Sequence, residues 1–90
     1  MLQIIGYQEE HGCEHCNRWL KHGIVLSNGK VVGATCFDKK LTQPLTDKRT
    51  GKKYRLGSEL IIRLAKVARL SPERQSQLGY GAHHFCFEAA

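Results

Sequence analysis

The chain has 90 residues, of which 41% are hydrophobic and 24% are charged, and its 14 Lys and Arg against 8 Asp and Glu give a formal net charge of +6. This length predicts one domain, residues 1–90, with a modest core, and no apolar run approaches the length of a membrane span. The charge favours a polyanionic partner, nucleic acid above all, and an acidic protein surface also fits. The first residues lack the basic region of a signal peptide, so we expect a cytoplasmic protein with reduced cysteines.

The N-terminal third predicts a strand, a turn and a hairpin. Residues 2–5 are apolar and predict a short strand, and residues 9–12 predict a turn that leads into the first cysteine pair. Residues 19–26 and 31–34 are two β-rich runs, and the Asn28-Gly29 pair lies between them. This is a strong hairpin signal, because a type I′ turn needs positive φ at both central residues.

The middle of the chain predicts a short helix and a basic connector. The helix begins near Cys36 with Thr35 as its N-cap, and Pro44 ends it. Residues 45–57 are polar and basic with Gly51 near their middle, and they form either a loop or a second small hairpin.

The C-terminal half, residues 58–79, predicts two helices. Ser58 is the expected N-cap of the first, an amphipathic helix. Ser71 and Pro72 begin the second, which ends at Leu78 with Gly79 as its C-cap. We expect the tail, residues 80–90, to pack back on the domain, because it contains Phe85 and Phe87. The apolar face of the first helix consists of Leu60, Ile61, Leu64, Ala65, Val67 and Ala68.

Three cysteines have a spacing that suits a structural zinc ion. Cys13 and Cys16 form a C-x-x-C pair, which places two sulfurs on one side of a tetrahedral ion. The hairpin that follows brings the chain back, and Cys36 at the start of the next helix can supply a third thiolate. A helix N-terminus stabilises such a negative charge.

The segment from the cysteine pair to GKVVGATCFDKK resembles the knuckle, hairpin and helix of treble-clef zinc fingers, in particular the first half of a LIM-type module. The resemblance covers about residues 12–41 and implies a zinc-binding fold. The LIM pattern has a histidine ligand three residues before the third cysteine, where this chain has Gly33. Lys39 and Lys40 stand where other treble clefs carry a ligand and cannot replace it.

The fourth ligand must then come from another part of the chain. Cys86 is the leading candidate, because it is the remaining cysteine and lies in a tail expected to pack back. His83 and His84 are the next candidates. The local alternatives are His11, His15 and His22, of which His15 ranks low because it lies within the C-x-x-C loop.

Other interpretations of the cysteines are reduced core thiols, an iron–sulfur cluster, a redox pair and haem attachment. A cluster needs four thiolates, the pair precedes a hairpin rather than a βαβ helix, and Asn17 replaces the histidine of the haem motif. The order of ligands in zinc deaminases is also missing. We therefore expect a structural Zn²⁺ and a protein that is not an enzyme.

The basic residues of the connector and of the amphipathic helix form the predicted nucleic-acid interface. Clustered Lys and Arg bind phosphates, and an aromatic side chain can stack on a base, although such a run can also be a solvated surface. Lys30, Lys39 and Lys40 add charge near the finger. The predicted interface comprises Lys48, Arg49, Lys52, Lys53, Tyr54, Arg55, Arg63, Lys66 and Arg69.

The sequence thus predicts an α+β fold, with a treble-clef-like half followed by an amphipathic helix and a short capped helix. Trp19 and Phe37 are expected in the core, whereas Tyr80 is expected to be packed, ligating or partner-facing. The predicted function is nucleic-acid binding, to DNA or RNA, through phosphate contacts. The alternative is a protein-binding module, or an inhibitor of the kind that mobile elements encode, acting on an acidic partner.

Overall fold

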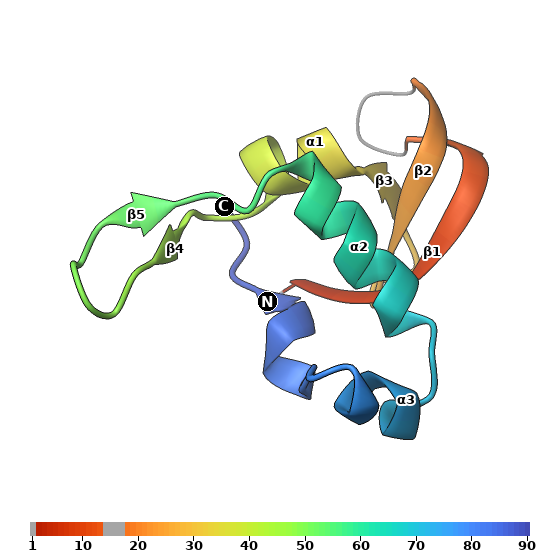
Figure 1. The fold of residues 1–90 in the computed structure, drawn as a ribbon. Helices are drawn as coiled ribbons and strands as arrows, with labels where there is room; N and C mark the ends of the chain where they lie inside the picture. The colour runs from red at the N-terminus through yellow and green to blue at the C-terminus, as the bar shows by residue number, and fades with distance from the viewer. Residues whose placement is uncertain (1, 14–17) are drawn as a thin grey trace.

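The computed structural model describes residues 2–13 and 18–90. Within these ranges the fold is α+β, as predicted, and is built on a four-stranded antiparallel sheet of order β3-β2-β1-β6 (Figure 1). The sheet contains β1 (Leu2–Gly12), β2 (Trp19–Leu26), β3 (Val31–Gly33) and β6 (Cys86–Phe87), and the other elements are α1 (Ala34–Cys36), a π-helical turn (Phe37–Leu41), β4 (Leu45–Thr46), β5 (Lys53–Tyr54), α2 (Ser58–Ala68), α3 (Pro72–Gln77) and a 3₁₀ turn (Ala82–Phe85).

Strand β1 is much longer than the strand predicted at residues 2–5. It pairs with β2 as far as Gly12, which lies opposite Trp19, so the predicted turn at residues 9–12 is wrong. Polar side chains such as Glu9 can occupy an antiparallel strand because one face of it is solvated, while its backbone groups are satisfied by the partner strand. The backbone N–H of Cys13 donates to the carbonyl of Arg18 at 2.7 Å, so the backbone pairing of the two strands extends to Cys13.

The predicted hairpin between β2 and β3 is confirmed, with Gly23 opposite Gly33 and Val25 opposite Val31. Its turn differs from the expected type I′. Gly29 has φ +87°, but the described non-glycine residues with positive φ do not include Asn28. The N–H of Gly29 donates to the Leu26 carbonyl at 3.0 Å, which closes a turn with one left-handed residue rather than two.

Two of the predicted helix caps are wrong by one or two positions. Gly33 is the N-cap of α1, so Thr35 lies inside the helix, and Gly57 is the N-cap of α2, so Ser58 is its first helical residue. Neither cap makes a side-chain hydrogen bond. The π-helical turn follows α1 directly. Just beyond it, the Thr42 hydroxyl donates to the Phe37 carbonyl at 2.8 Å.

Helix α3 begins as predicted and ends at Gln77 with Leu78 as its C-cap, one residue earlier than predicted. The Ser71 hydroxyl accepts a hydrogen bond from the Arg74 N–H at 3.4 Å, and Pro72 occupies the first turn. Gly79, just beyond the helix, has φ +86°, which a residue with a side chain rarely adopts. The sequence signals for this helix are local, and they determine its ends.

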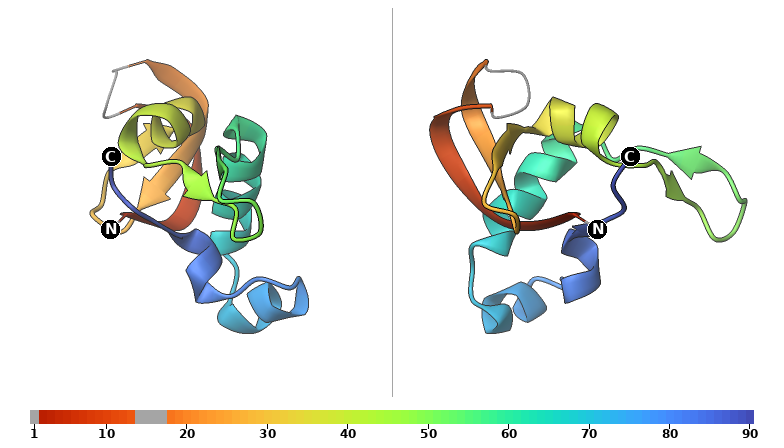
Figure 2. Two further views of the ribbon diagram at one scale, coloured as in Figure 1. Left: turned by 90° about the vertical axis from the view of Figure 1, so that its left-hand side faces the viewer. Right: turned by 180° about the vertical axis from the view of Figure 1, so that it is seen from behind.

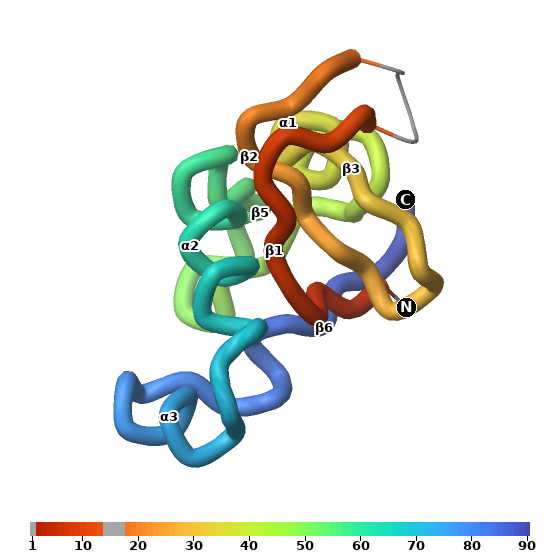
Figure 3. The backbone as a smooth tube through the Cα atoms, turned by 90° about the vertical axis from the view of Figure 1, so that its right-hand side faces the viewer, coloured from red at the N-terminus to blue at the C-terminus, as the bar shows by residue number. Residues whose placement is uncertain are grey.

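The core lies between the sheet, α2 and the tail. Helix α2 buries Ile61, Leu64, Ala65 and Val67, while Leu60 from the predicted apolar face is 42% exposed. Phe37 is fully buried, as predicted, and meets the Phe87 ring edge-on with 5.1 Å between ring centroids. Phe85 and Phe87 are both buried, so the tail packs back as expected. Figure 3 shows β6 beside the start of β1.

Trp19 contradicts the prediction that it belongs to the core, because its side chain is 73% exposed. It is the first residue of β2, opposite Gly12, where the two strands extend beyond the part of the sheet that α2 covers. At this end of the ribbon the described elements leave most of the large side chain in solvent. Its position, not its residue type, decides its exposure.

The second small hairpin, β4–β5, is the alternative that the structure confirms for residues 45–57. Leu45 pairs with Tyr54 and Thr46 with Lys53. Figure 2 shows this hairpin projecting from the body of the molecule, away from the four-stranded sheet.

Candidate metal centre and basic surfaces

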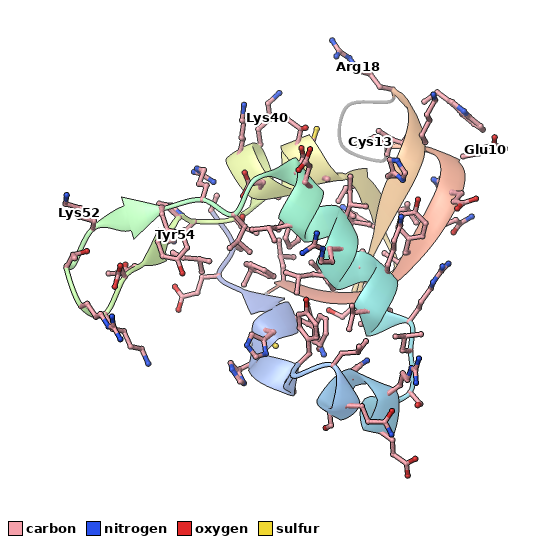
Figure 4. All side chains as sticks on the ribbon, in the orientation of Figure 1. Glu10, Cys13, Arg18, Lys40, Lys52 and Tyr54 are labelled. Atoms are coloured by element: carbon pink, nitrogen blue, oxygen red, sulfur yellow. The ribbon has the colours of Figure 1, made fainter. Side chains whose placement is uncertain are left out.

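Cys13 and the start of α1 form the described part of the candidate metal centre. The Cys13 side chain is 1% exposed, and the Gly33 backbone N–H donates to its sulfur at 3.3 Å. Figure 4 shows Cys13 at the end of β1, close to the segment that leads into α1. Backbone N–H donors to sulfur favour the thiolate, the form of cysteine that binds metal. The local chemistry therefore fits a zinc ligand.

Cys36 lies one helical turn beyond Gly33 in sequence, at the end of α1, and is partly buried. Residues three apart on a helix lie on the same side of it. The backbone contact between Gly33 and Cys13 thus places the turn that carries Cys36 near the Cys13 sulfur. Two of the three cysteines predicted from spacing are brought to one region of the fold.

Gly33 stands where the resemblance implies a histidine, and the structure gives a steric reason for glycine. A Cβ at this position would lie 3.1 Å from Leu20 Cδ2 and 4.0 Å from the Cys13 sulfur. Any side chain would have to displace Leu20. Gly33 contributes a backbone N–H to the site instead of a ligand.

Cys16, the remaining predicted thiolate, lies outside the described residues, as do Glu14, His15 and Asn17. Within residues 2–13 and 18–90, no group of three or more His, Cys, Asp or Glu side chains is placed to hold a metal ion. Neither His11 nor His22 therefore joins Cys13 and Cys36 as a third described ligand.

Cys86 is not brought to the other cysteines. It lies on β6 opposite Gln3, near the start of β1, whereas Cys13 follows the far end of the same strand. Ten residues of strand span on the order of 30 Å. The leading prediction for the fourth ligand therefore does not fit the fold, because β6 pairs with the wrong end of β1.

His83 and His84 belong to the same distant region as Cys86. They precede β6 on the 3₁₀ turn, with 4.0 Å between their ring centroids, and His84 Nδ1 accepts the Gly81 N–H at 2.9 Å. Together with Cys86 and Tyr80 they line a pocket of about 270 Å³ that also includes apolar residues of α2.

The two described local histidines have other contacts. His11 Nδ1 lies 2.7 Å from the carbonyl oxygen of Gly12, to which it donates as the Nδ1–H tautomer. His22 Nδ1 is hydrogen-bonded to the Tyr7 hydroxyl, and the two rings lie side by side with 5.7 Å between centroids. His22 thus pairs with Tyr7 in a side-chain contact between β1 and β2.

The tip of the β4–β5 hairpin concentrates the exposed cations of the connector. Asp47 orders the tip: its N–H donates to the Lys52 carbonyl at 2.8 Å, its own carbonyl accepts the Gly51 N–H at 2.8 Å, and its carboxylate accepts the Arg49 N–H at 2.8 Å. The tip is therefore ordered by local hydrogen bonds without being buried. Its exposed cations are Lys48, Arg49, Lys52 and Lys53.

The base of this hairpin is clamped to the body from both sides. The Gln43 N–H donates to the Glu88 carbonyl at 2.9 Å, and the Ala90 N–H donates to the Leu41 carbonyl at 3.0 Å. On the other strand, the Arg55 guanidinium donates to the carbonyls of Asp38 and Thr42, the latter at 3.1 Å. Arg55 thus anchors the hairpin through one guanidinium nitrogen, and its side chain stays exposed.

Two of the three predicted helix cations, Lys66 and Arg69, do not continue the hairpin surface. Lys66 Nζ and the Arg69 guanidinium lie 5.3 and 5.2 Å from the centre of the Tyr7 ring, where each makes a cation–π contact with β1. Arg63 lines the pocket beside Tyr54 and Cys86. The predicted interface therefore divides into a hairpin tip and a separate helix surface.

A third basic region surrounds Trp19, which the sequence reasoning assigned to the core. A hollow of about 520 Å³ lies between the start of β2, α1 and the start of α2, and Trp19, Arg18, Lys21 and Lys40 line it. The sequence does contain a signal for this exposure, because Trp19 lies between Arg18 and Lys21. Charged residues such as these are mostly exposed in folded proteins.

No family model, curated protein or solved structure matches this chain. Among the described helices, none has the length and the apolar composition needed to cross a membrane.

Proposed function

We propose that this chain is a small nucleic-acid-binding protein that presents the β4–β5 hairpin to a phosphate backbone. The observation that carries the proposal is the tip itself: four exposed cations on an ordered ribbon that projects from the core (Figure 4 labels Lys52 and Tyr54 on it). These four side chains are exposed, so the core does not depend on them. Clustered Lys and Arg bind phosphates and release counterions, which is the main source of affinity for nucleic acid.

The shape of the hairpin supports the same proposal. A two-stranded ribbon is narrow enough to enter the major groove of a duplex or to lie along one strand. Tyr54, 47% exposed beside Lys53, adds an aromatic surface for a base. The role is binding rather than catalysis, and an acidic protein surface is the other partner that the charge would suit.

A structural Zn²⁺ held by Cys13, Cys16 and Cys36 is part of the proposal. It is supported by the buried Cys13 sulfur, by its hydrogen bond from Gly33, and by the position of Cys36 one turn further on. Such an ion would supply a cross-link between the β1–β2 reversal and α1, in the manner of a treble-clef finger. The chain's own residues, and not the ion, would contact the partner.

The test is the salt dependence of binding to a labelled DNA duplex, measured by fluorescence anisotropy. Lys48→Ala/Lys52→Ala should weaken binding and reduce the slope of log K against log salt by roughly 2, because each phosphate contact contributes about one unit. The control, Lys30→Ala/Arg74→Ala, removes the same charge from two exposed positions outside the hairpin and should leave the slope unchanged.

If both double variants change the slope equally, the hairpin has no special part and only net charge matters. If neither duplex nor single strand binds at low salt, the nucleic-acid proposal fails. Binding to polyglutamate with the affinity expected for nucleic acid would instead favour the acidic protein partner.

A further inference from the structure

Trp19 is the only tryptophan of the chain, and its side chain is the most exposed of the large hydrophobic residues described. Its 73% exposure contrasts with Phe37, Phe85 and Phe87, none of which exceeds 6%. A domain of this size has few aromatic side chains to form its core. A solvent-exposed indole presents a flat aromatic face on which a ligand can stack.

The surroundings of Trp19 combine cationic and apolar side chains, and Cys36 of the candidate metal centre also lines the hollow. Arg18, Lys21 and Lys40 line the hollow beside it, and Leu20, Ala34 and Ile62 provide apolar surface. No Asp or Glu is among the described residues that line it. In Figure 4, Arg18 lies at the end of the molecule away from Lys52, and Lys40 lies between them on the turn after α1, so this surface does not include the hairpin tip.

We infer that Trp19 and this hollow bind an unpaired nucleotide, with the base stacked on the indole and the flanking phosphates contacted by Arg18, Lys21 and Lys40. The base of a single strand has a free π-face, whereas bases within a duplex are already stacked on their neighbours. A group of cations around a flat aromatic ring matches a base with its phosphates. The inference rests on the proposed function for the class of ligand, but it uses residues outside the hairpin and specifies an unpaired strand.

A protein partner suits this surface less well. Tryptophan at the centre of a protein interface is normally surrounded by apolar neighbours that exclude water. Here the other exposed large hydrophobic side chains, Leu60, Leu70 and Leu78 among them, do not line the hollow. The charge around Trp19 favours the nucleotide.

Intrinsic fluorescence tests the inference directly, because the emission of the native chain comes from one indole. The protein is titrated with oligo(dT), and separately with an abasic oligodeoxynucleotide of the same length, which has the phosphates but no bases. Oligo(dT) should quench the emission and the abasic strand should leave it nearly unchanged. Equal quenching by both would overturn the inference.

Variants provide the second arm, with the oligonucleotides labelled so that anisotropy reports binding. Trp19→Ala should weaken oligo(dT) binding about 5- to 150-fold, the range that corresponds to the loss of one stacked base. Its affinity for the abasic strand should stay the same. Leu78→Ala, which removes an exposed apolar side chain on the distant α3 region, is the control and should change neither affinity.

The possible results separate this inference from the proposed function. If the abasic strand and duplex bind but Trp19→Ala leaves oligo(dT) affinity unchanged, the nucleotide site is wrong and the phosphate contact stands. If no nucleic acid binds, both fail. If polyglutamate quenches Trp19 as strongly as oligo(dT), the surface serves an acidic protein segment. Because Trp19 is exposed, its replacement should leave the thermal midpoint of unfolding unchanged.

Discussion

Among the described glycines, Gly23 of β2 has the least space for a Cβ atom, because β1 and β3 lie on either side of it. A Cβ there would lie 2.7 Å from the Gln8 carbonyl oxygen and 2.7 Å from Val31 Cγ1. Because one of these atoms belongs to the backbone of β1, a rotamer change cannot relieve the contact. Glycine at this position is required by the spacing of the strands.

Gly23→Ala should therefore lower the free energy of unfolding by about 1–3 kcal/mol, the usual cost of overpacking. Alanine also lowers the conformational entropy of the unfolded chain, which stabilises the fold by less than about 1 kcal/mol. The cost of the clash is larger, so we expect a net loss of stability. Gly12→Ala is the control, since a Cβ there has no neighbour within 4 Å. Urea denaturation compares the two variants, and equal midpoints would contradict the steric argument.

Tyr7 makes the stability of the fold depend on pH in the alkaline range. Burial raises the pKa of its phenol above the ordinary value of 10.0, Glu9 raises it further, and Arg69 opposes the shift. The folded state thus holds the phenol proton more tightly than the unfolded chain. This contribution to stability is fully present below pH 10 and is lost as the pH rises through the raised pKa.

Tyr7→Phe should remove that contribution, so its thermal midpoint should fall less than that of the native chain as the pH rises above 10. The comparison must be made between the two proteins, because lysines and other tyrosines titrate in the same range. Parallel curves for the two proteins would show that Tyr7 is not responsible.

At the scale of elements, the β1–β2 reversal and α1 are predicted to be joined by metal, and the cysteines provide a matched pair of variants. Cys13→Ser should lose the bound zinc and lower the thermal midpoint, because Cys13 is buried at the site. Cys86→Ser should keep the zinc, because β6 holds Cys86 at the other end of β1.

Native mass measurement with and without a chelator reads out both variants. A native chain whose mass is unchanged by chelation would end the zinc proposal. Loss of zinc from Cys86→Ser with retention by Cys13→Ser would show that the ligand set is centred on the tail instead.

At the scale of the whole molecule, the sequence predicts those elements whose signals are local. The Asn28-Gly29 turn identifies the β2–β3 hairpin, and Ser71 with Gly79 delimits α3. The pairing of Cys86 with Gln3 depends on two distant segments that carry no mutual signal. The fourth ligand was misplaced for this reason, since packing of the tail was predictable but its partner strand was not.

The predicted binding surface divides for a similar reason. Charge counting places Lys53 and Lys66 in one interface, whereas the fold sends the hairpin outward and turns Lys66 onto the Tyr7 ring. Likewise, composition favours a buried Trp19, and only the length of β1 and β2 shows that Trp19 lies at a strand end where it is 73% exposed. Exposure is a property of the tertiary arrangement, which residue type alone does not specify.

The clamped base of the β4–β5 hairpin has a consequence for how the protein can be degraded. Its exposed tip carries four Lys and Arg residues, the sites at which trypsin-like proteases cut, and exposed loop tips are where such cuts occur first. Both sides of the hairpin are held independently, one by the tail at Gln43 and the other by Arg55. A single cut at the tip would therefore leave both fragments attached to an intact core. The proposed nucleic-acid binding through the tip would then be lost before the domain unfolds.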